Sequence, residues 1–192
     1  MFRYLAEDIA FLLIKNKIVD IEKRDIYVYG LEAILLNLLN ILTALTISIL
    51  SKTMLHFGMF MLIFIPLRLF IGGYHAKTSE SCYIITTAIY ILTVLAVKFL
   101  PDLYCNIPAI ITLIILIIPI IAFAPAENTN NPLSASQRKR NRFISLILTA
   151  IDSLIFIMLA LNSYRVATSI MIFIAVNSVL MVLGIIEARR LR

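Results

Sequence analysis

The chain has 192 residues and a net charge of +6; it is 61% apolar and only 15% charged. A soluble domain needs more charged surface than this, and a disordered chain is far less apolar. Five glycines and two cysteines exclude collagen-like and disulfide-rich scaffolds. The apolar runs are continuous, unlike the alternating pattern of a β-barrel. The composition therefore predicts an all-α, polytopic membrane helical bundle.

Residues 1–25 mix apolar and charged side chains at helical spacing. The apolar positions that share one helical face are Phe2, Leu5, Ile9, Leu12 and Leu13. Charges run through the whole segment, which is unlike a signal peptide. We expect an amphipathic helix in the membrane interface, and the spacing leaves open a cytoplasmic helix that packs on the bundle.

Residues 26–192 are expected to form a single transmembrane domain. A spanning helix needs about 20 mostly apolar residues, and charge-poor runs of this kind predict six spans. The spans cover residues 29–51, 54–71, 81–100, 107–124, 143–162 and 166–187. The second span is the weakest of the six, because Pro66 and Arg68 interrupt its end.

The basic residues predict the orientation of the spans. With both termini in the cytoplasm, 14 of the 17 Lys and Arg residues fall on the cytoplasmic side. Those 14 are Arg3, Lys15, Lys17, Lys23, Arg24, Arg68, Lys77, Arg138, Lys139, Arg140, Arg142, Arg189, Arg190 and Arg192. Lys52, Lys98 and Arg165 fall outside. This asymmetry is the positive-inside pattern of a multi-pass cell-membrane protein.

The basic run before the fifth span lies in a cytoplasmic loop, residues 125–142. It consists of Arg138, Lys139, Arg140 and Arg142. Its position beside a span favours a topological role over nucleic-acid binding. Attraction of anionic lipid head groups or of an acidic peptide tail is a further use.

The turn at residues 72–81 joins spans two and three and carries unusual polar residues. Gly72 and Gly73 allow backbone angles that end a helix sharply. The Ser79-Glu80-Ser81 stretch supplies N-cap residues and an acid for the first turn of the next helix. Cys82 then falls in that first turn, where the helix dipole favours the thiolate.

His75 lies seven residues before Cys82. On one continuous helix the two residues would be about 10 Å apart along the axis, too far for proton transfer. A cysteine nucleophile with a histidine base is therefore possible only if the helix breaks between them. The spacing alone leaves open a buried structural cysteine with an interfacial histidine.

Two other arrangements of these residues are disfavoured. A disulfide from Cys82 to Cys105 would have to cross the third span, about 30 Å. A metal site lacks the ligand spacing of known motifs, so we expect neither a metal nor a cofactor.

Charged residues within or beside the spans are candidates for function. Arg68 can orient a carboxylate or stabilise an oxyanion, and the backbone N–H groups around Ser81 and Cys82 are second oxyanion candidates. Asp152 lies halfway along span five and is expected to have a partner or a bound water. Glu80, Asp152 and the four basic residues of the 125–142 loop are candidates for substrate binding.

The pattern formed by Arg68, Gly72, Gly73, His75, Ala76 and Cys82 resembles that of the accessory gene regulator B (AgrB) family. A second match is the stretch Ala124-Pro125-Ala126-Glu127-Asn128 with Asn131-Pro132-Leu133, followed by the basic run. The length, the six apolar segments and the basic loop also agree with this family.

The resemblance implies a membrane cysteine endopeptidase of Gram-positive quorum sensing. Such proteins cut the C-terminal tail from a short, AgrD-like precursor peptide. Cys82 would form a thioester with the precursor, and His75 would be its base or ion-pair partner. A thiol or hydroxyl of the precursor would then close a thiolactone or lactone ring. The resemblance also implies a homodimer, and the precursor is expected to arrive at the cytoplasmic face.

Two other classes of protein remain open from the sequence. One is a small membrane transporter or exporter of peptides without covalent chemistry, which the Pro, Asn and Asp residues of the spans would suit. The other is a structural or assembly protein in which the His75 and Cys82 pair is coincidental.

Overall fold

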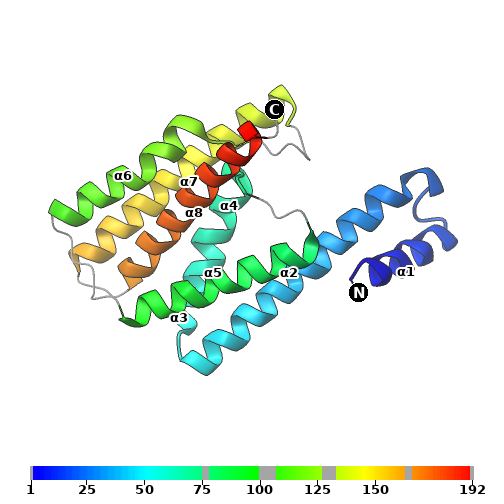
Figure 1. Cartoon of the computed structure of the whole chain (residues 1–192), viewed down its shortest axis with the longest axis horizontal. Helices are drawn as coiled ribbons and strands as arrows, with labels where there is room; N and C mark the ends of the chain where they lie inside the picture. Colours follow the sequence, from blue (N-terminus) through cyan, green and yellow to red (C-terminus); the bar gives the residue numbers. More distant parts are fainter. Residues whose placement is uncertain (1, 75–77, 100–106, 127–132, 163–165, 191–192) are drawn as a thin grey trace. The chain divides into compact units, whose positions relative to one another are not determined.

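The computed structural model describes residues 2–74, 78–99, 107–126, 133–162 and 166–190, and structural statements concern these residues (Figure 1). They form α1 (Phe2–Lys15), α2 (Arg24–Ser51), α3 (Met54–Met59), α4 (Ile65–Ile71), α5 (Ser79–Phe99), α6 (Ile107–Phe123), α7 (Ala135–Leu161) and α8 (Val166–Arg190). A short 3-10 helix, Ile21–Lys23, precedes α2, and a π-helical stretch, Phe60–Phe64, joins α3 to α4.

Five helical segments are long and apolar enough to cross a membrane. They are Ile21–Ser51, Met54–Ile71, Glu80–Phe99, Ala135–Leu161 and Val166–Arg190. The remaining apolar helix, α6, has 17 residues, which is at the short end of the spanning range. Each predicted apolar run contains a helix, so the all-α membrane fold is confirmed.

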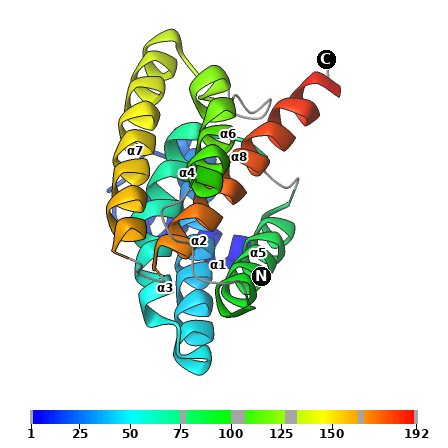
Figure 2. The same ribbon diagram turned by 90° about the vertical axis from the view of Figure 1, so that its left-hand side faces the viewer.

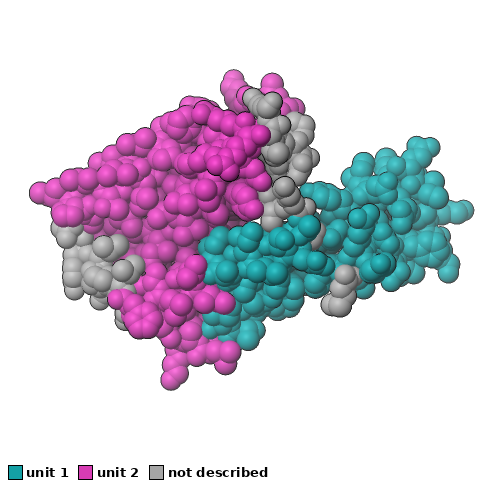
Figure 3. All heavy atoms as spheres, viewed as in Figure 1, with its two compact units in different colours: residues 1–47, 76–90 teal, residues 48–75, 91–192 magenta. Residues whose placement is uncertain are grey.

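The described chain divides into two compact units, drawn in teal and magenta in Figure 3. Unit 1 comprises residues 1–47 and 76–90, and unit 2 comprises residues 48–75 and 91–192.

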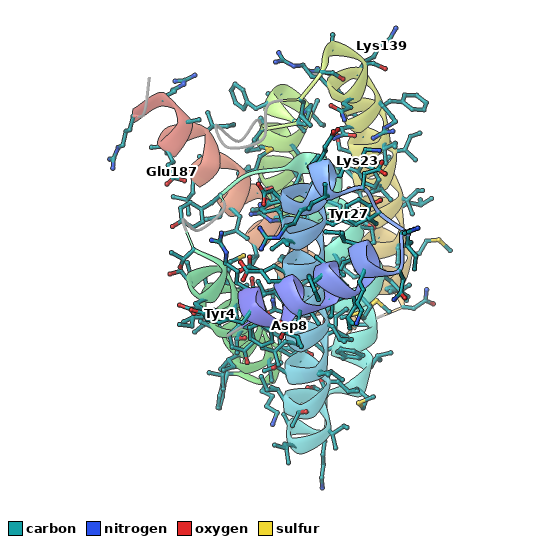
Figure 4. The ribbon with its side chains drawn as sticks, turned by 90° about the vertical axis from the view of Figure 1, so that its right-hand side faces the viewer. Tyr4, Asp8, Lys23, Tyr27, Lys139 and Glu187 are labelled. Carbon is teal, nitrogen blue, oxygen red and sulfur yellow. The ribbon has the colours of Figure 1, made fainter. Side chains whose placement is uncertain are left out.

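In unit 1, α1 packs on α2 through small side chains. Ala6 and Ala10 are buried and form a cluster with Val28, against which Leu31 and Leu35 pack. Leu5 and Leu12 of the predicted apolar face are instead about half exposed. Tyr4 and Asp8, labelled in Figure 4, lie on the exposed side of α1. The helix therefore packs on α2, and its location in the membrane interface stays a prediction.

In unit 2, α8 is the central helix. It contacts α3, the π-helical stretch, α4, α6 and α7 (Figure 2). Phe173, Ile174 and Met181 of α8 are completely buried. Since α7 and α8 follow one another as antiparallel neighbours, the start of α7 and the end of α8 lie at the same end of this unit.

The π-helical stretch, Phe60–Phe64, accommodates Pro66 in the second span. Proline has no N–H group, and its ring collides with the carbonyl four residues earlier in a regular helix. Here the Ile65 N–H donates to the Phe60 carbonyl, five residues back, which widens the helix before the proline. The span continues to Ile71 without a break.

Buried polar side chains link the helices of unit 2. His56 is 3% exposed, shares hydrogen bonds with the hydroxyls of Ser169 (3.1 Å) and Thr93 (3.2 Å), and stacks on Phe173. Ser178 of α8 donates to the Leu116 carbonyl of α6, as expected for interhelical hydrogen bonds.

Asp152 is a buried charged residue within α7. Its side chain is buried, at 4% exposure, yet its Oδ2 atom has no hydrogen-bond partner within the described part of the chain. A partner or a water at this oxygen therefore stays a prediction. The hydroxyls of the buried face of α7, Ser145 and Thr149, donate to carbonyls of α7 itself.

Candidate functional site

The second span ends where the two glycines predict it. α4 stops at Ile71, and Gly72 and Gly73 then adopt positive φ angles of 68° and 119°. These angles belong to the region that glycine tolerates and other residues resist. α4 and α5 are therefore separate helices, and α5 begins at Ser79. The geometry between His75 and Cys82 stays a prediction, because residues 75–77 lie outside the described residues.

Gly72 lies against the segment that precedes α7. The Ala126 N–H donates to the Ile71 carbonyl at 2.8 Å, and Gly72 and Ala126 form an isolated parallel bridge. A Cβ atom on Gly72 would lie only 2.2 Å from the Ala126 carbonyl oxygen. The fold thus joins the two motifs, which are more than 50 residues apart in the sequence.

Gly73 and Tyr74 lie on α8. The Tyr74 N–H donates to the Leu180 carbonyl at 2.9 Å. A Cβ atom on Gly73 would lie 2.8 Å from that carbonyl oxygen, and one on Gly184 would lie 2.3 Å from the carbonyl carbon of Gly73. Gly184 did not emerge from the sequence motifs. Its signal was a glycine inside an otherwise regular helix, where this residue is unfavourable.

Arg68 closes the same turn from α4. Its Nη1 atom donates to the Gly72 carbonyl at 2.6 Å, and its Nη2 atom donates to the Tyr74 carbonyl. The side chain is partly buried. The guanidinium therefore holds the backbone on both sides of Gly73. That Arg68 orients a carboxylate or stabilises an oxyanion stays a prediction.

Cys82 lies in the first turn of α5, as predicted, but the helix cap differs from the expected one. Thr78, one residue before the Ser79–Ser81 stretch, accepts the Ser81 N–H through its hydroxyl oxygen (3.2 Å). The Thr78 carbonyl accepts the Cys82 N–H at 3.0 Å. Threonine has the same short hydroxyl as serine, so composition did not separate the candidates. Both N–H groups proposed as oxyanion donors are thus paired within the cap.

The Cys82 side chain is a free thiol of intermediate exposure. Glu80 and Ser81, in the same turn, are exposed. His75, the candidate base, and Cys105 lie outside the described residues. Among the described residues, no three His, Cys, Asp or Glu side chains gather as metal ligands.

The four basic residues of the 125–142 loop are exposed in the first two turns of α7. This helix begins at Ala135, earlier than predicted, with Ser134 and Gln137 in a reciprocal capping box. Lys139 on α7 and Glu187 on α8 are labelled in Figure 4. Arg189 and Arg190 are exposed at the end of α8, so basic side chains gather at one end of unit 2. Asp152 lies away from this end, midway along α7.

The fold and composition define an α-helical, multi-pass membrane protein. A family model described as "Accessory gene regulator B" matches residues 6–183, and the chain belongs to that family. It is also 29% identical over 120 residues to accessory gene regulator protein B of Staphylococcus aureus (strain bovine RF122 / ET3-1). That match covers 62% of this chain and 63% of the relative, just under two thirds of its length. No solved structure matches the chain.

Proposed function

We propose that this protein is a membrane cysteine endopeptidase that matures a short signalling peptide for quorum sensing. Membership of the accessory gene regulator B family gives the system in which it acts. The observation that carries the enzymatic proposal is the free, partly exposed Cys82 in the first turn of a helix that starts anew after the Gly72–Gly73 break.

In the proposed reaction, the Cys82 thiolate attacks the carbonyl carbon of one peptide bond of an AgrD-like precursor. The bond to nitrogen breaks, and His75 supplies the proton that the departing tail amine requires. The upstream part of the precursor remains on the cysteine sulfur as a thioester. A thiol or hydroxyl of the precursor then attacks that thioester, its proton returns to His75, and the ring closes as Cys82 leaves.

The position of Cys82 in the cap supports this role. The backbone dipoles at a helix N-terminus favour a negative charge close to the first turn. Glu80 is exposed in that turn, and its negative charge opposes the effect of the helix dipole. A histidine partner would supply a positive charge that favours the thiolate.

The basic end of unit 2 supports recognition of an acidic tail. Four basic residues lie at the start of α7, where the helix dipole is also positive, and no acidic residue is present in its first turn. The turn at Gly73 and Tyr74 contacts α8 near the same end. Neutralising Arg138, Lys139, Arg140 and Arg142 should therefore weaken precursor processing, while membrane insertion is retained. Unchanged processing by the inserted variant would count against this binding role.

The experiment for the reaction is cleavage of a co-reconstituted precursor in lipid vesicles. The precursor is a synthetic amphipathic peptide with an internal cysteine and an acidic C-terminal tail, and mass analysis detects the freed tail. We expect Cys82→Ala and His75→Ala to abolish release, while Cys105→Ala retains it. Continued cleavage by Cys82→Ala would refute the proposal. Passage of the intact peptide across the membrane without cleavage would favour an exporter.

We also propose that both termini and the 72–81 turn face the cytoplasm, and that the protein forms a homodimer in contact with lipid. The charge asymmetry supports the orientation. Membrane-impermeant thiol labelling of Cys82 in right-side-out and inverted vesicles tests it. Labelling only in inverted vesicles is expected, and labelling from outside would contradict it. Chemical cross-linking of the inserted protein tests the dimer.

A further inference from the structure

We propose that Gly184 of α8 is a positioning residue for the Gly73–Tyr74 backbone, which leads to the candidate histidine of the reaction proposed above. It lets the backbone of Gly73 and Tyr74 lie directly on α8, and Tyr74 is joined to His75. This inference rests on the proposed function. It adds a residue from the opposite end of the sequence, outside both motifs, to the parts that the reaction needs.

The contact at Gly184 is between backbone atoms. A Cβ atom at this position would lie 2.3 Å from the Gly73 carbonyl carbon, 2.4 Å from the Tyr74 nitrogen and 2.6 Å from the Gly73 Cα atom. Ordinary contacts of a Cβ atom lie at 3.4–4 Å. None of the three atoms can rotate away as a side-chain end can, so any side chain at 184 must displace the chain at Gly73 and Tyr74.

Two further contacts show that the turn rests on one short part of α8. The Tyr74 N–H donates to the Leu180 carbonyl at 2.9 Å, one helical turn before Gly184. A Cβ atom on Gly73 would lie 2.8 Å from the Cα atom of Met181, whose side chain is completely buried. Leu180, Met181 and Gly184 therefore form a seat for the two residues that precede His75.

The requirement at Gly184 is specific to this site. The other glycines inside helices, Gly30 of α2 and Gly58 of α3, have no atom within 4 Å of an added Cβ. Alanine has a higher helix propensity than glycine, and this gain is the same in Gly58→Ala and Gly184→Ala. The two variants differ only in the contact that the added Cβ atom makes with Gly73 and Tyr74. Gly58→Ala, in the same unit, is therefore the matched control.

The size of the expected effect follows from the displacement. Moving the turn to a normal contact distance requires a shift of about 1 Å, and a misplacement of this size can lower a catalysed rate about 100-fold. The loss should appear in kcat, because the seat lies under the turn and leaves the exposed basic residues of α7 in place. KM for the precursor should be unchanged.

The test uses the full-length protein in lipid vesicles in a Cys105→Ser background, so that Cys82 is the only thiol. Four proteins are compared: this background, Gly184→Ala, Gly58→Ala and His75→Ala. The readouts are precursor cleavage and the rate at which iodoacetamide alkylates Cys82. At about pH 6.5 alkylation reports assistance by His75, and at about pH 10 it reports access to the thiol alone.

We expect Gly184→Ala to cleave about 100-fold more slowly and to alkylate at the slow rate of His75→Ala at about pH 6.5. At about pH 10 all four proteins should alkylate equally, and Gly58→Ala should match the background throughout. A change in folding alone would not reproduce this pH-selective loss. If insertion of Gly184→Ala falls, both rates are measured on the inserted fraction after its purification.

Background rates of cleavage and alkylation in Gly184→Ala would overturn the inference and leave the proposed function intact. If His75→Ala also shows background rates, the proposed function itself fails. A rise in KM with an unchanged kcat would assign Gly184 to substrate binding and would likewise overturn the positioning role.

Discussion

Replacing Arg68 by lysine keeps the positive charge at the end of α4 but removes the planar fork that reaches two carbonyls. Arg68 donates from Nη1 to Gly72 and from Nη2 to Tyr74. A lysine ammonium is a compact point charge without this planar fork, so we expect it to keep only one of the two hydrogen bonds. Alanine keeps neither. The turn should therefore loosen in the order arginine, lysine, alanine.

The magnitude follows from the number of bonds and from their exposure. A hydrogen bond to a charged group contributes about 1.5–3 kcal/mol. Arg68 is only partly buried, so the lower end of this range applies to each bond. Losing one bond then costs about 1.5 kcal/mol and losing both about 3 kcal/mol. Since 1.4 kcal/mol is a factor of ten, opening of the turn rises about 10-fold in Arg68→Lys and about 100-fold in Arg68→Ala.

Hydrogen exchange of the Tyr74 amide measures this opening, because that N–H donates to the Leu180 carbonyl only while the turn is closed. Exchange is followed by mass spectrometry on the vesicle-embedded protein. Arg189→Lys, an exposed change at the end of α8, is the matched control and should leave Tyr74 protection unchanged. Wild-type protection in Arg68→Lys would refute the reasoning, because charge alone would then suffice.

Three other substitutions test the packing of the bundle by thermal unfolding in detergent. His56→Ala should destabilise unit 2 by about 2–4 kcal/mol, because it leaves a cavity and removes a partner from two buried hydroxyls; an unchanged midpoint would contradict the hydrogen-bonded arrangement. Asp152→Asn should raise the midpoint, with a gain of up to about 2.5 kcal/mol, because one oxygen of this buried carboxylate has no hydrogen-bond partner among the described residues. A lower midpoint would show that the carboxylate has a required role. Ala10→Leu should cost about 1–3 kcal/mol by overpacking the contact between α1 and α2, whereas Leu5→Ala, on the exposed side, should cost little; equal effects would place α1 differently.

The spans were predictable because a long run without charges has few structures open to it in a membrane. Their ends were less so. α7 begins at Ala135 and not near residue 143, since a helix continues into water wherever its cap and propensity allow. The signal was present in Ser134 and Gln137, whose spacing is that of a capping box. Hydropathy alone does not detect this capping box, because the first turns of α7 are polar.

The site was predictable where its determinants are local. Gly72 and Gly73 break the helix through their own backbone freedom, and Cys82 follows a cap within four residues. The partners of the turn are not local. Ala126 and Gly184 meet it only after the chain has folded, so a single sequence offers no spacing that links them. The same holds for the buried face of α1, which depends on the shape of α2.

The π-helical stretch has a consequence for the register of the second span. His56 and Arg68 are twelve residues apart, which places them about 120° apart around a regular helix. The wider stretch between them acts as one inserted residue and takes back about 100°. It thereby places His56, which contacts Ser169, and Arg68, which holds the turn, on nearly the same face of the span. Counted in residues, the span is one longer than a straight helix with this alignment requires. Deleting a single residue from Phe60–Phe64 would therefore let this stretch become a regular α-helix while the two ends of the span stay in phase.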